Sequence, residues 1–262
     1  MPSYRLIDSH AHLEDVPDLD EALARAREAG VVAVVAVGSD YDSNQRVLDI
    51  AARHNGFVFP ALGLHPSNMA QGCDVQRALQ SIEDNISVAV AVGEVGLDYH
   101  KRVLAGVSKE KQREVLTVLL ELARRHDKAV AVHSRYSWQD ALDSVAQAGV
   151  RRAVFHWYAG PLSVLQGILD RGYCISATPA AVNRDEHRKA LQAAPLDRLL
   201  LETDSPVTYR DEAGAEFQAE PAHVAVTLGA VVALKGLDPG EVAARTTENC
   251  RELYGLPEKL LL

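Results

Sequence analysis

The sequence has few cysteines and no long apolar run. Its cysteines, Cys73, Cys174 and Cys250, form no C-x-x-C pair, so neither a disulfide framework nor a cysteine zinc site is expected, and each is interpreted as a small buried apolar side chain. No window approaches the ~18 consecutive apolar residues of a membrane helix, and the first residues, MPSYRLIDSH, lack the pattern of a signal peptide. We therefore expect a cytoplasmic protein with no membrane partner.

Basic residues are also in deficit. The chain has 27 Lys and Arg against 36 Asp and Glu, a formal net charge of -9. Proteins that hold long duplex nucleic acid by releasing counterions are usually basic, so that class is disfavoured. A nuclease is still compatible with this charge, because a locally positive site can hold one phosphate on an otherwise acidic surface.

The apolar pattern indicates a single domain over residues 1–262, because no Ser-, Pro- or Gly-rich linker divides the chain. Short β-branched runs predict eight strands: Arg5–His10, Val31–Val37, Val58–Leu64, Val88–Val95, Ala129–His133, Ala153–His156, Tyr173–Ser176 and Leu199–Thr203. Amphipathic stretches predict helices that include Leu19–Ala29, Ser43–His54, Ser108–His126, Trp138–Ala148, Pro161–Arg171, Glu186–Ala193, Ala222–Leu234 and Pro239–Thr246. This alternation predicts an α/β fold, a (β/α)8 TIM barrel, with a doubly wound sheet as the alternative.

Several predicted strands end in His, Glu or Asp, and in a barrel all of these ends lie on the face where active sites are assembled. His10-Ala11-His12 is the sharpest of these signals, because residues i and i+2 of a strand point the same way and both imidazoles can reach one ion. Glu94 ends a run of small apolar residues, where a carboxylate is costly unless it is paired or metal-bound. We interpret Glu94 as a carboxylate that bridges two ions, with a buried salt bridge as the alternative.

Three further strand ends complete the candidate ligand set. His133 follows Ala129–Val132, and His156 follows Ala153–Phe155. Either histidine alone would more often be a core residue, but six ligand-type residues at equivalent ends are an improbable coincidence. Asp204 suits both metal ligation and the orientation or deprotonation of a water molecule.

A charge count indicates an anionic substrate. Two divalent cations bring +4, and two carboxylates and four neutral imidazoles leave the centre positive, which suits a phosphate. Arg135 is expected to donate to a phosphate oxygen, with a rim salt bridge as the alternative. His65 is expected to contact the substrate or donate a proton, with a structural role as the alternative. Four imidazoles favour zinc, manganese, cobalt or iron over magnesium.

Other residues near the strand ends are given supporting roles. Asp98 and Asp8 are interpreted as carboxylates that orient a ligand histidine. Trp157 and Tyr158 would stack on a base or sugar, or pack at the rim. The remaining histidines are given no metal role: His54, His100, His126, His187 and His223.

In order along the chain, these motifs resemble the TatD-like family of metal-dependent deoxyribonucleases, within the amidohydrolase-type barrels. The matching segments are Asp8-Ser9-His10-Ala11-His12, Gly63-Leu64-His65-Pro66, Gly93-Glu94-Val95-Gly96-Leu97-Asp98, His133-Ser134-Arg135 and Glu202-Thr203-Asp204-Ser205-Pro206. The resemblance implies one ion held by His10, His12 and Asp204, a second held by His133 and His156, and Glu94 shared between them. It also implies phosphodiester hydrolysis on DNA, commonly from a strand end.

Some positions depart from the family pattern. Leu116 and Leu119 stand where an aromatic residue and a second Gln are usual, Tyr136 stands where Asp is frequent, and Phe217–Pro221 lacks a basic group expected at the substrate rim. His156-Trp157-Tyr158 looks closer to the archaeal branch.

The resulting hypothesis is a hydrolase that cleaves DNA, single-stranded or at a strand end, with a hydroxide activated at a dinuclear site of Zn, Mn, Mg, Co or Fe. Asp204 is the expected proton acceptor, and no obligate protein partner is evident. Two alternatives stay open. One is a deacylase or amidohydrolase acting on an ester or amide, such as a D-aminoacyl-tRNA ester. The other is a barrel that binds metal or a partner without catalysis, which a fold alone does not exclude.

Overall fold

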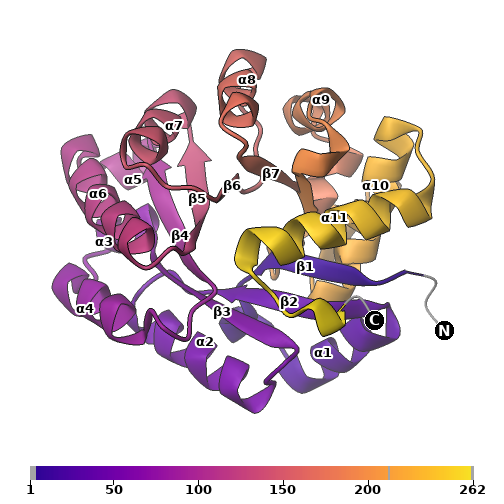
Figure 1. The fold of residues 1–262 in the computed structure, drawn as a ribbon, viewed down its shortest axis with the longest axis horizontal. Helices are drawn as coiled ribbons and strands as arrows, with labels where there is room; N and C mark the ends of the chain where they lie inside the picture. The colour runs from indigo at the N-terminus through magenta and orange to yellow at the C-terminus, as the bar shows by residue number, and fades with distance from the viewer. Residues whose placement is uncertain (1–3, 212, 261–262) are drawn as a thin grey trace.

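The computed structural model describes residues 4–211 and 213–260. Its main sheet contains eight strands in sequence order, each paired in parallel with the next (Figure 1). They are β1 (Leu6–Ala11), β2 (Val31–Val37), β3 (Val58–Leu64), β4 (Ala91–Asp98), β5 (Ala129–Arg135), β6 (Ala153–Phe155), β7 (Cys174–Ala177) and β8 (Leu199–Leu201). This sequential order confirms the (β/α)8 barrel and excludes a doubly wound sheet.

Backbone hydrogen bonds between the first strand and the segment after the last strand join the two edges of the sheet. The Asp204 amide donates to the carbonyl of His10 over 2.9 Å, and the His12 amide donates to the carbonyl of Ser205 over 2.8 Å. Ala11 and Ser205 form a parallel bridge at the same level. Residues near position 10 and residues near position 204 therefore lie side by side at the carboxyl ends of the strands.

Helices surround the barrel, and one covers the end at which the strands begin. The helices are α1 (Leu19–Glu28), α2 (Tyr41–Arg53), α3 (Pro66–Ala70), α4 (Val75–Asn85), α5 (Lys101–Leu104), α6 (Lys109–Arg125), α7 (Trp138–Gln147), α8 (Leu162–Asp170), α9 (Asp185–Ala193), α10 (Val224–Lys235) and α11 (Pro239–Tyr254). Helix α11 crosses the barrel in Figure 1, and its Asn249 amide donates to the carbonyl of Leu199 at the start of β8. Cys250, Leu253 and Tyr254 pack against the strand residues inside the barrel. The carboxyl ends of the strands are left to form the site.

The barrel interior is filled by small side chains, and a larger apolar layer lies between the strands and the helices. Ala33, Ala61, Ala91 and Ala131 are fully buried among the residues inside the barrel. Leu and Val side chains of strands and helices form the outer layer. Strands buried on both faces explain why their sequences are almost continuously apolar rather than alternating.

The structure shifts several predicted boundaries by one or two residues, corrects β4 and α11 by more, and adds elements. Strand β4 begins at Ala91 rather than Val88, whose side chain is 58% exposed. Helix α11 runs on past Thr246 to Tyr254, because the Thr246 hydroxyl donates to the carbonyl of Val242 within the helix and does not end it. Helices α3, α4 and α5, and a small hairpin of β9 (Thr208–Arg210) and β10 (Glu216–Gln218), were not predicted.

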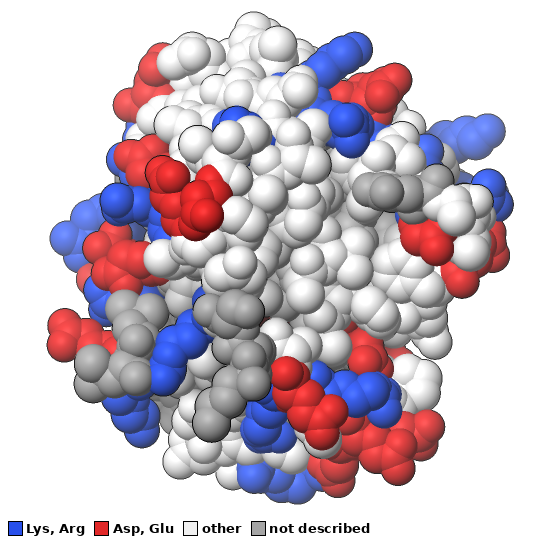
Figure 2. Space-filling model, turned by 90° about the vertical axis from the view of Figure 1, so that its right-hand side faces the viewer, with Lys and Arg blue, Asp and Glu red and all other residues white. Residues whose placement is uncertain are grey.

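The face of the molecule that carries α10 has few charged side chains at its centre. In Figure 2 the charged side chains gather around the margins of this face and leave its centre uncharged. Among the described residues, no single helix is long and apolar enough to span a membrane, and the bent pair 221–235 and 239–254 passes that test only when joined across a 115° break.

Candidate metal centre

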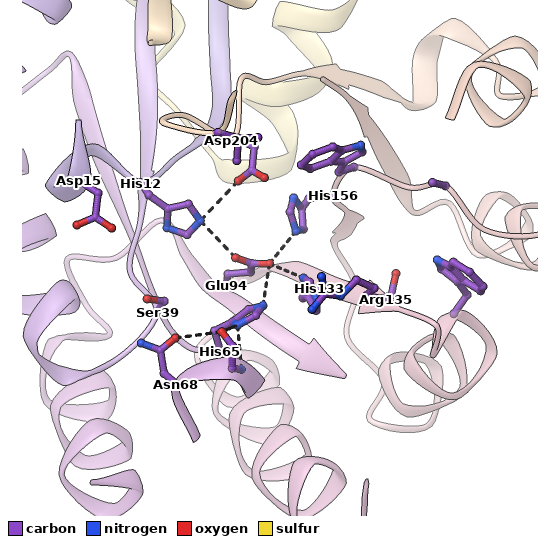
Figure 3. A pocket seen from close by; sticks show the side chains of 16 residues that line it. His12, Asp15, Ser39, His65, Asn68, Glu94, His133, Arg135, His156 and Asp204 are labelled. Carbon is purple, nitrogen blue, oxygen red and sulfur yellow. Dashed lines mark hydrogen bonds and ion pairs between the residues drawn. The ribbon is translucent and has the colours of Figure 1, made fainter. Parts of the chain in front are cut away.

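Glu94 lies at the centre of a cluster at the carboxyl ends of the strands, and Figure 3 shows it between His12, His133, His156 and Asp204. The elements that supply the cluster are β1 and the residue after it, β4, β5, the residue after β6 and the segment after β8. They bring together His10, His12, Glu94, His133, His156 and Asp204. All but two of these side chains are buried, and His12 and His133 are partly exposed. The cluster opens into a pocket of about 520 Å³.

One oxygen of Glu94 faces the two histidines of the first strand. Glu94 Oε2 lies 3.6 Å from Nε2 of His10 and 3.4 Å from Nε2 of His12. Asp204 Oδ1 lies 3.5 Å from both of these nitrogens. Each of these two imidazole nitrogens therefore lies 3.4–3.6 Å from two carboxylate oxygens.

The other oxygen of Glu94 faces three further histidines. Glu94 Oε1 lies 2.7 Å from Nδ1 of His133 and 2.7 Å from Nε2 of His156. His65 Nε2 lies 3.5 Å from the same oxygen. The two oxygens of one carboxylate thus face two separate groups of nitrogen donors.

The spacing of the donors around Glu94 Oε2 fits a divalent cation. Atoms bound tetrahedrally at roughly 2.0–2.2 Å from a zinc ion lie roughly 3.3–3.6 Å from one another. The separations of 3.4–3.6 Å around Glu94 Oε2 match this value and exceed a good hydrogen bond. Within the described residues, both ring nitrogens of His10 are buried without a hydrogen-bond partner. A cation would satisfy Nε2 of this ring.

The carboxylates give the cluster a field that attracts positive charge. Burial lowers the pKa of His12, but hydrogen bonding to Glu94 and the charge of Asp204 outweigh it and raise the pKa to about 9. Burial also lowers the pKa of His156, but the charge of Glu94 outweighs it, and the pKa lies well above its usual value. Burial raises the pKa of Glu94, but the surrounding histidines hold it well below the ordinary range. The charged form of Glu94 is therefore favoured where an isolated buried carboxylate would be neutral.

Glycines allow the backbone near Glu94 to pack closely against the neighbouring strands. A Cβ atom on Gly63 of β3 would lie 2.4 Å from the backbone nitrogen and oxygen of Glu94. A Cβ atom on Gly93 would lie 2.5 Å from the Cβ of Ala131 on β5. The prediction that glycine beside Glu94 serves close approach is consistent with these distances, and Gly63 has the same effect from the other side.

His65 is held by the helix that follows it. It is the residue before α3, and its Nδ1 accepts the backbone N–H of Ser67 over 3.1 Å. Because Nδ1 is an acceptor, the neutral ring carries its proton on Nε2, the atom that faces Glu94. Burial lowers the pKa of His65 to about 3 despite the nearby charge of Glu94, so the ring is a neutral N–H donor.

Asp98 contacts a site histidine, as predicted, and also pairs with Arg135. Asp98 Oδ2 lies 3.2 Å from Nε2 of His133, the nitrogen opposite the one that faces Glu94. The same oxygen lies 2.7 Å from an Arg135 guanidinium nitrogen. Burial raises the pKa of Asp98, but His133 and Arg135 outweigh it and hold the pKa below its usual value. Arg135 therefore forms the rim ion pair, while its half-exposed guanidinium still lines the pocket.

Glu202 lies beside His156 as Asp98 lies beside His133. Glu202 was given no role from the sequence alone. Its Oε1 lies 3.4 Å from Nδ1 of His156 and accepts the backbone N–H of Trp157 over 3.0 Å. Its side chain is 1% exposed. A carboxylate that holds the outer nitrogen of a ligand histidine fixes the ring orientation and raises its basicity. A signal was present, because Glu202 is an acidic residue in the apolar strand run two positions before Asp204.

The Glu202→Gln variant is expected to bind divalent metal about 10- to 100-fold more weakly than the parent. Glutamine can still accept the Trp157 N–H, but it lacks the negative charge that favours an Nδ1 proton on His156. Competition with a chromophoric zinc chelator measures this affinity. Glu220→Gln is the matched control, because Glu220 pairs with Arg25 instead of a site histidine. Equal affinity of the two variants would contradict a role for Glu202 in holding His156.

The structure corrects two supporting roles. Tyr158 is fully buried and its hydroxyl donates to the carbonyl of Pro161, so it cannot stack on a substrate, because the chain turns inward after Trp157. Asp8 accepts both the N–H and the hydroxyl of Thr203, at 2.9 and 2.6 Å, and contacts no histidine ring. It ties the end of β8 to β1. Trp157 lines the pocket as predicted.

Four of the five histidines given no metal role lie outside the group of donors around Glu94, whereas His100 donates its backbone N–H to Asp98. His54 and His126 follow the ends of α2 and α6, and His223 precedes α10. His187 lies within α9, fully buried, with Nδ1 at 2.8 Å from the carbonyl of Tyr158. Within residues 4–211 and 213–260 the three cysteines are free. Cys174 and Cys250 are buried as predicted, whereas Cys73 is only partly buried.

Comparison with known proteins gives the family of the chain. The family model described as "TatD related DNase" matches residues 7–255. The chain belongs to the TatD family. It is 32% identical to human "Deoxyribonuclease TATDN3", over 95% of this chain and 94% of that protein. It is also 32% identical to "Uncharacterized metal-dependent hydrolase TatD" of Mycobacterium tuberculosis, over 96% of this chain and 98% of that protein.

Solved structures show the same fold. The Escherichia coli TatD homologue YJJV superposes with a TM-score of 0.86 at 27% identity, over 97% of this chain and 99% of that one. The phosphotriesterase homology protein of Escherichia coli, complexed with phosphate in its active site, superposes with a TM-score of 0.67 at 16% identity, over 96% and 98% of the two chains. This chain is thus a metal-dependent hydrolase with the TatD fold.

Proposed function

We propose that this TatD-family hydrolase cleaves phosphodiester bonds in DNA, from a strand end, at a site for two divalent cations. The observation that carries the proposal is the position of Glu94, whose two oxygens face separate groups of nitrogen donors. The deoxyribonuclease name of the human relative supports DNA as the substrate.

The two groups of donors indicate how the ligands divide. His10, His12 and Asp204 lie around Glu94 Oε2 and would hold one ion. His133 and His156 lie against Glu94 Oε1 and would hold the other, with Asp98 and Glu202 behind them. Such a pair of ions polarises a phosphoryl oxygen, lowers the pKa of water and stabilises the leaving oxygen. Four imidazoles favour Zn²⁺, Mn²⁺, Co²⁺ or Fe²⁺ over Mg²⁺.

Asp204 is suited to accept a proton from the attacking water. Its Oδ1 faces both His10 and His12, which leaves its second carboxylate oxygen as the proton acceptor. His65 is suited to the opposite task, because its neutral ring presents an N–H toward the cluster. It can donate to a phosphate oxygen or to the leaving group.

Two neighbouring residues of the pocket wall can donate hydrogen bonds to a phosphate. The Ser134 hydroxyl is buried, and within the described residues it has no partner. The Arg135 guanidinium is 48% exposed while one edge pairs with Asp98. A planar guanidinium held by a carboxylate in this way keeps further N–H groups for a phosphate oxygen.

Hydrolysis of an ester or amide is the second candidate. The pocket favours it in one respect, because Arg135 is the single Lys or Arg among its lining residues and is already paired. An aminoacyl ester brings less negative charge than a DNA strand, and the same cations would polarise its carbonyl.

Hydrolysis assays with both substrate classes decide between these functions. Metal-reconstituted protein is incubated with a single-stranded DNA 12-mer and, separately, with a D-aminoacyl-tRNA ester. We expect stepwise shortening of the DNA from one end, with the Asp204→Asn variant at least about 100-fold slower. Internal cuts would contradict the strand-end mode. Cleavage of the ester alone would overturn DNA as the substrate and leave the metal centre as proposed.

A further inference from the structure

Tyr136 is an aromatic side chain exposed beside the pocket. It follows β5 directly after Arg135, and 60% of its surface is accessible. Its φ of +57° places a bulky residue in the left-handed region, which L side chains rarely adopt. Residues held in this region are found preferentially at ligand-binding and active sites.

Tyr136 belongs to a group of rings that leads out of the pocket. Its ring lies 5.9 Å from that of Trp138 in an edge-on arrangement and 6.0 Å from that of His100 in a stacked one. Trp138 lines the pocket together with Trp157. We call His100, Tyr136 and Trp138 the aromatic rim.

The aromatic rim is joined to the metal centre by direct contacts. The Tyr99 backbone N–H donates to the carbonyl of Arg135 over 2.9 Å, so the two strand ends run side by side. Asp98, which contacts His133, accepts the backbone N–H of His100 over 2.8 Å. A substrate that leaves the pocket past Arg135 therefore meets the rim next.

Basic side chains continue beyond the rim. Lys101 and Arg102 are exposed at the start of α5, directly after His100. Further along, Lys111 and Arg113 are already paired with Glu114 and Asp140. On a chain with a net charge of -9, two exposed cations beside the aromatic rim form a local positive surface.

The pocket holds only a small part of a polymeric substrate. At about 520 Å³ the pocket has the size of a small-molecule site, so most of a DNA strand must lie outside it. Proteins that bind single strands combine aromatic platforms for the bases with cations along the backbone. Bases within a duplex are already stacked and do not present their faces.

Resting on the proposed function, we infer that the aromatic rim is a base-stacking subsite. Unpaired nucleobases next to the scissile phosphate lie on Tyr136 and Trp138, and the following phosphates lie along Lys101 and Arg102. The subsite selects single-stranded DNA with little regard to sequence, because every base offers a π-face.

Binding of two labelled octamers to the metal-reconstituted protein tests this subsite. One is oligo(dT) with hydrolysis-resistant phosphorothioate linkages, and the other has the same backbone without bases. Tyr136→Ala is expected to weaken binding of the first by about tenfold and leave the second unchanged. Tyr136→Phe should bind as the parent does, and Tyr4→Ala is the control for an exposed tyrosine outside the site. Fluorescence anisotropy measures each Kd.

The basic part of the subsite has its own readout. The Lys101→Ala/Arg102→Ala double variant is expected to weaken binding of both octamers and to reduce the slope of log K against log salt by about 1.4, or 0.7 for each lost phosphate contact. If Tyr136→Ala affects both octamers equally, or neither, the stacking subsite is wrong even when the parent shortens DNA. If the parent neither binds nor cleaves DNA, the proposed function itself fails.

Discussion

Glu94→Gln is expected to lower kcat/KM for oligonucleotide cleavage by at least about a thousandfold and to abolish stable metal binding. The reason is that both oxygens of Glu94 face nitrogen donors, whereas glutamine offers one oxygen, one NH₂ group and no charge. Because the side chain keeps its size, the cluster loses charge without a cavity. Initial rates and elemental analysis of the dialysed protein measure the two effects.

The result can be separated from a loss of folding. Circular dichroism of Glu94→Gln should retain the parent spectrum, because glutamine has nearly the size of glutamate and the apolar core is unchanged. Glu220→Gln, which removes a carboxylate from an ion pair outside the site, should keep both metal and activity. A Glu94→Gln protein that retained the parent's metal content would show that Glu94 is not shared between the ions.

Removal of metal is expected to have the second largest effect. Chelation followed by dialysis should bring hydrolysis to background. It should also lower the unfolding midpoint, because metal binds the folded protein and not the unfolded chain and so stabilises the folded state. At a metal concentration of 100 times Kd this contribution is about 2.7 kcal/mol, or roughly 5–10 °C for a chain of this length. Differential scanning calorimetry with and without added metal gives the shift, and two equivalents at saturation would support the dinuclear site.

Calorimetry of the metal-free protein at increasing concentrations of each metal distinguishes the cations. Zn²⁺, Mn²⁺, Co²⁺ or Fe²⁺ should restore the midpoint at lower concentration than Mg²⁺, because imidazole suits these ions better. His10→Ala is the control, since it removes a buried ring whose Nε2 lies beside Glu94 and Asp204. If its midpoint responds to metal as the parent's does, the donor group around Glu94 Oε2 is not the binding site.

The fold and the clustering of the candidate ligands were predictable for a single physical reason. Strands buried on both faces leave long apolar runs, and in a parallel barrel the carboxyl ends of all strands meet at one face. Polar residues that end these runs, such as His133 after Ala129–Val132, must therefore converge wherever they are in the sequence. His10, His133 and Asp204 needed no local motif to be brought together.

Other features depend on side-chain direction and on loops, which apolar periodicity does not encode. Tyr158 lies in the core and Trp157, the residue before it, lines the pocket. The path of the chain after β6 sets this difference. Glu202 and Asp204 are separated by two positions, yet one lies behind His156 and the other faces His10. The short helix α3, which fixes the ring of His65, has too few residues to show a helical period.

The hydrogen bonds that join β1 to the segment after β8 have a consequence for biosynthesis. His10 and His12 leave the ribosome before Asp204, which follows more than 190 residues later and whose amide donates to the carbonyl of His10. The edges of the barrel and the donor group around Glu94 Oε2 cannot be completed before then. A growing chain whose synthesis has not passed Asp204 therefore lacks the closed barrel, and we expect no hydrolysis from it.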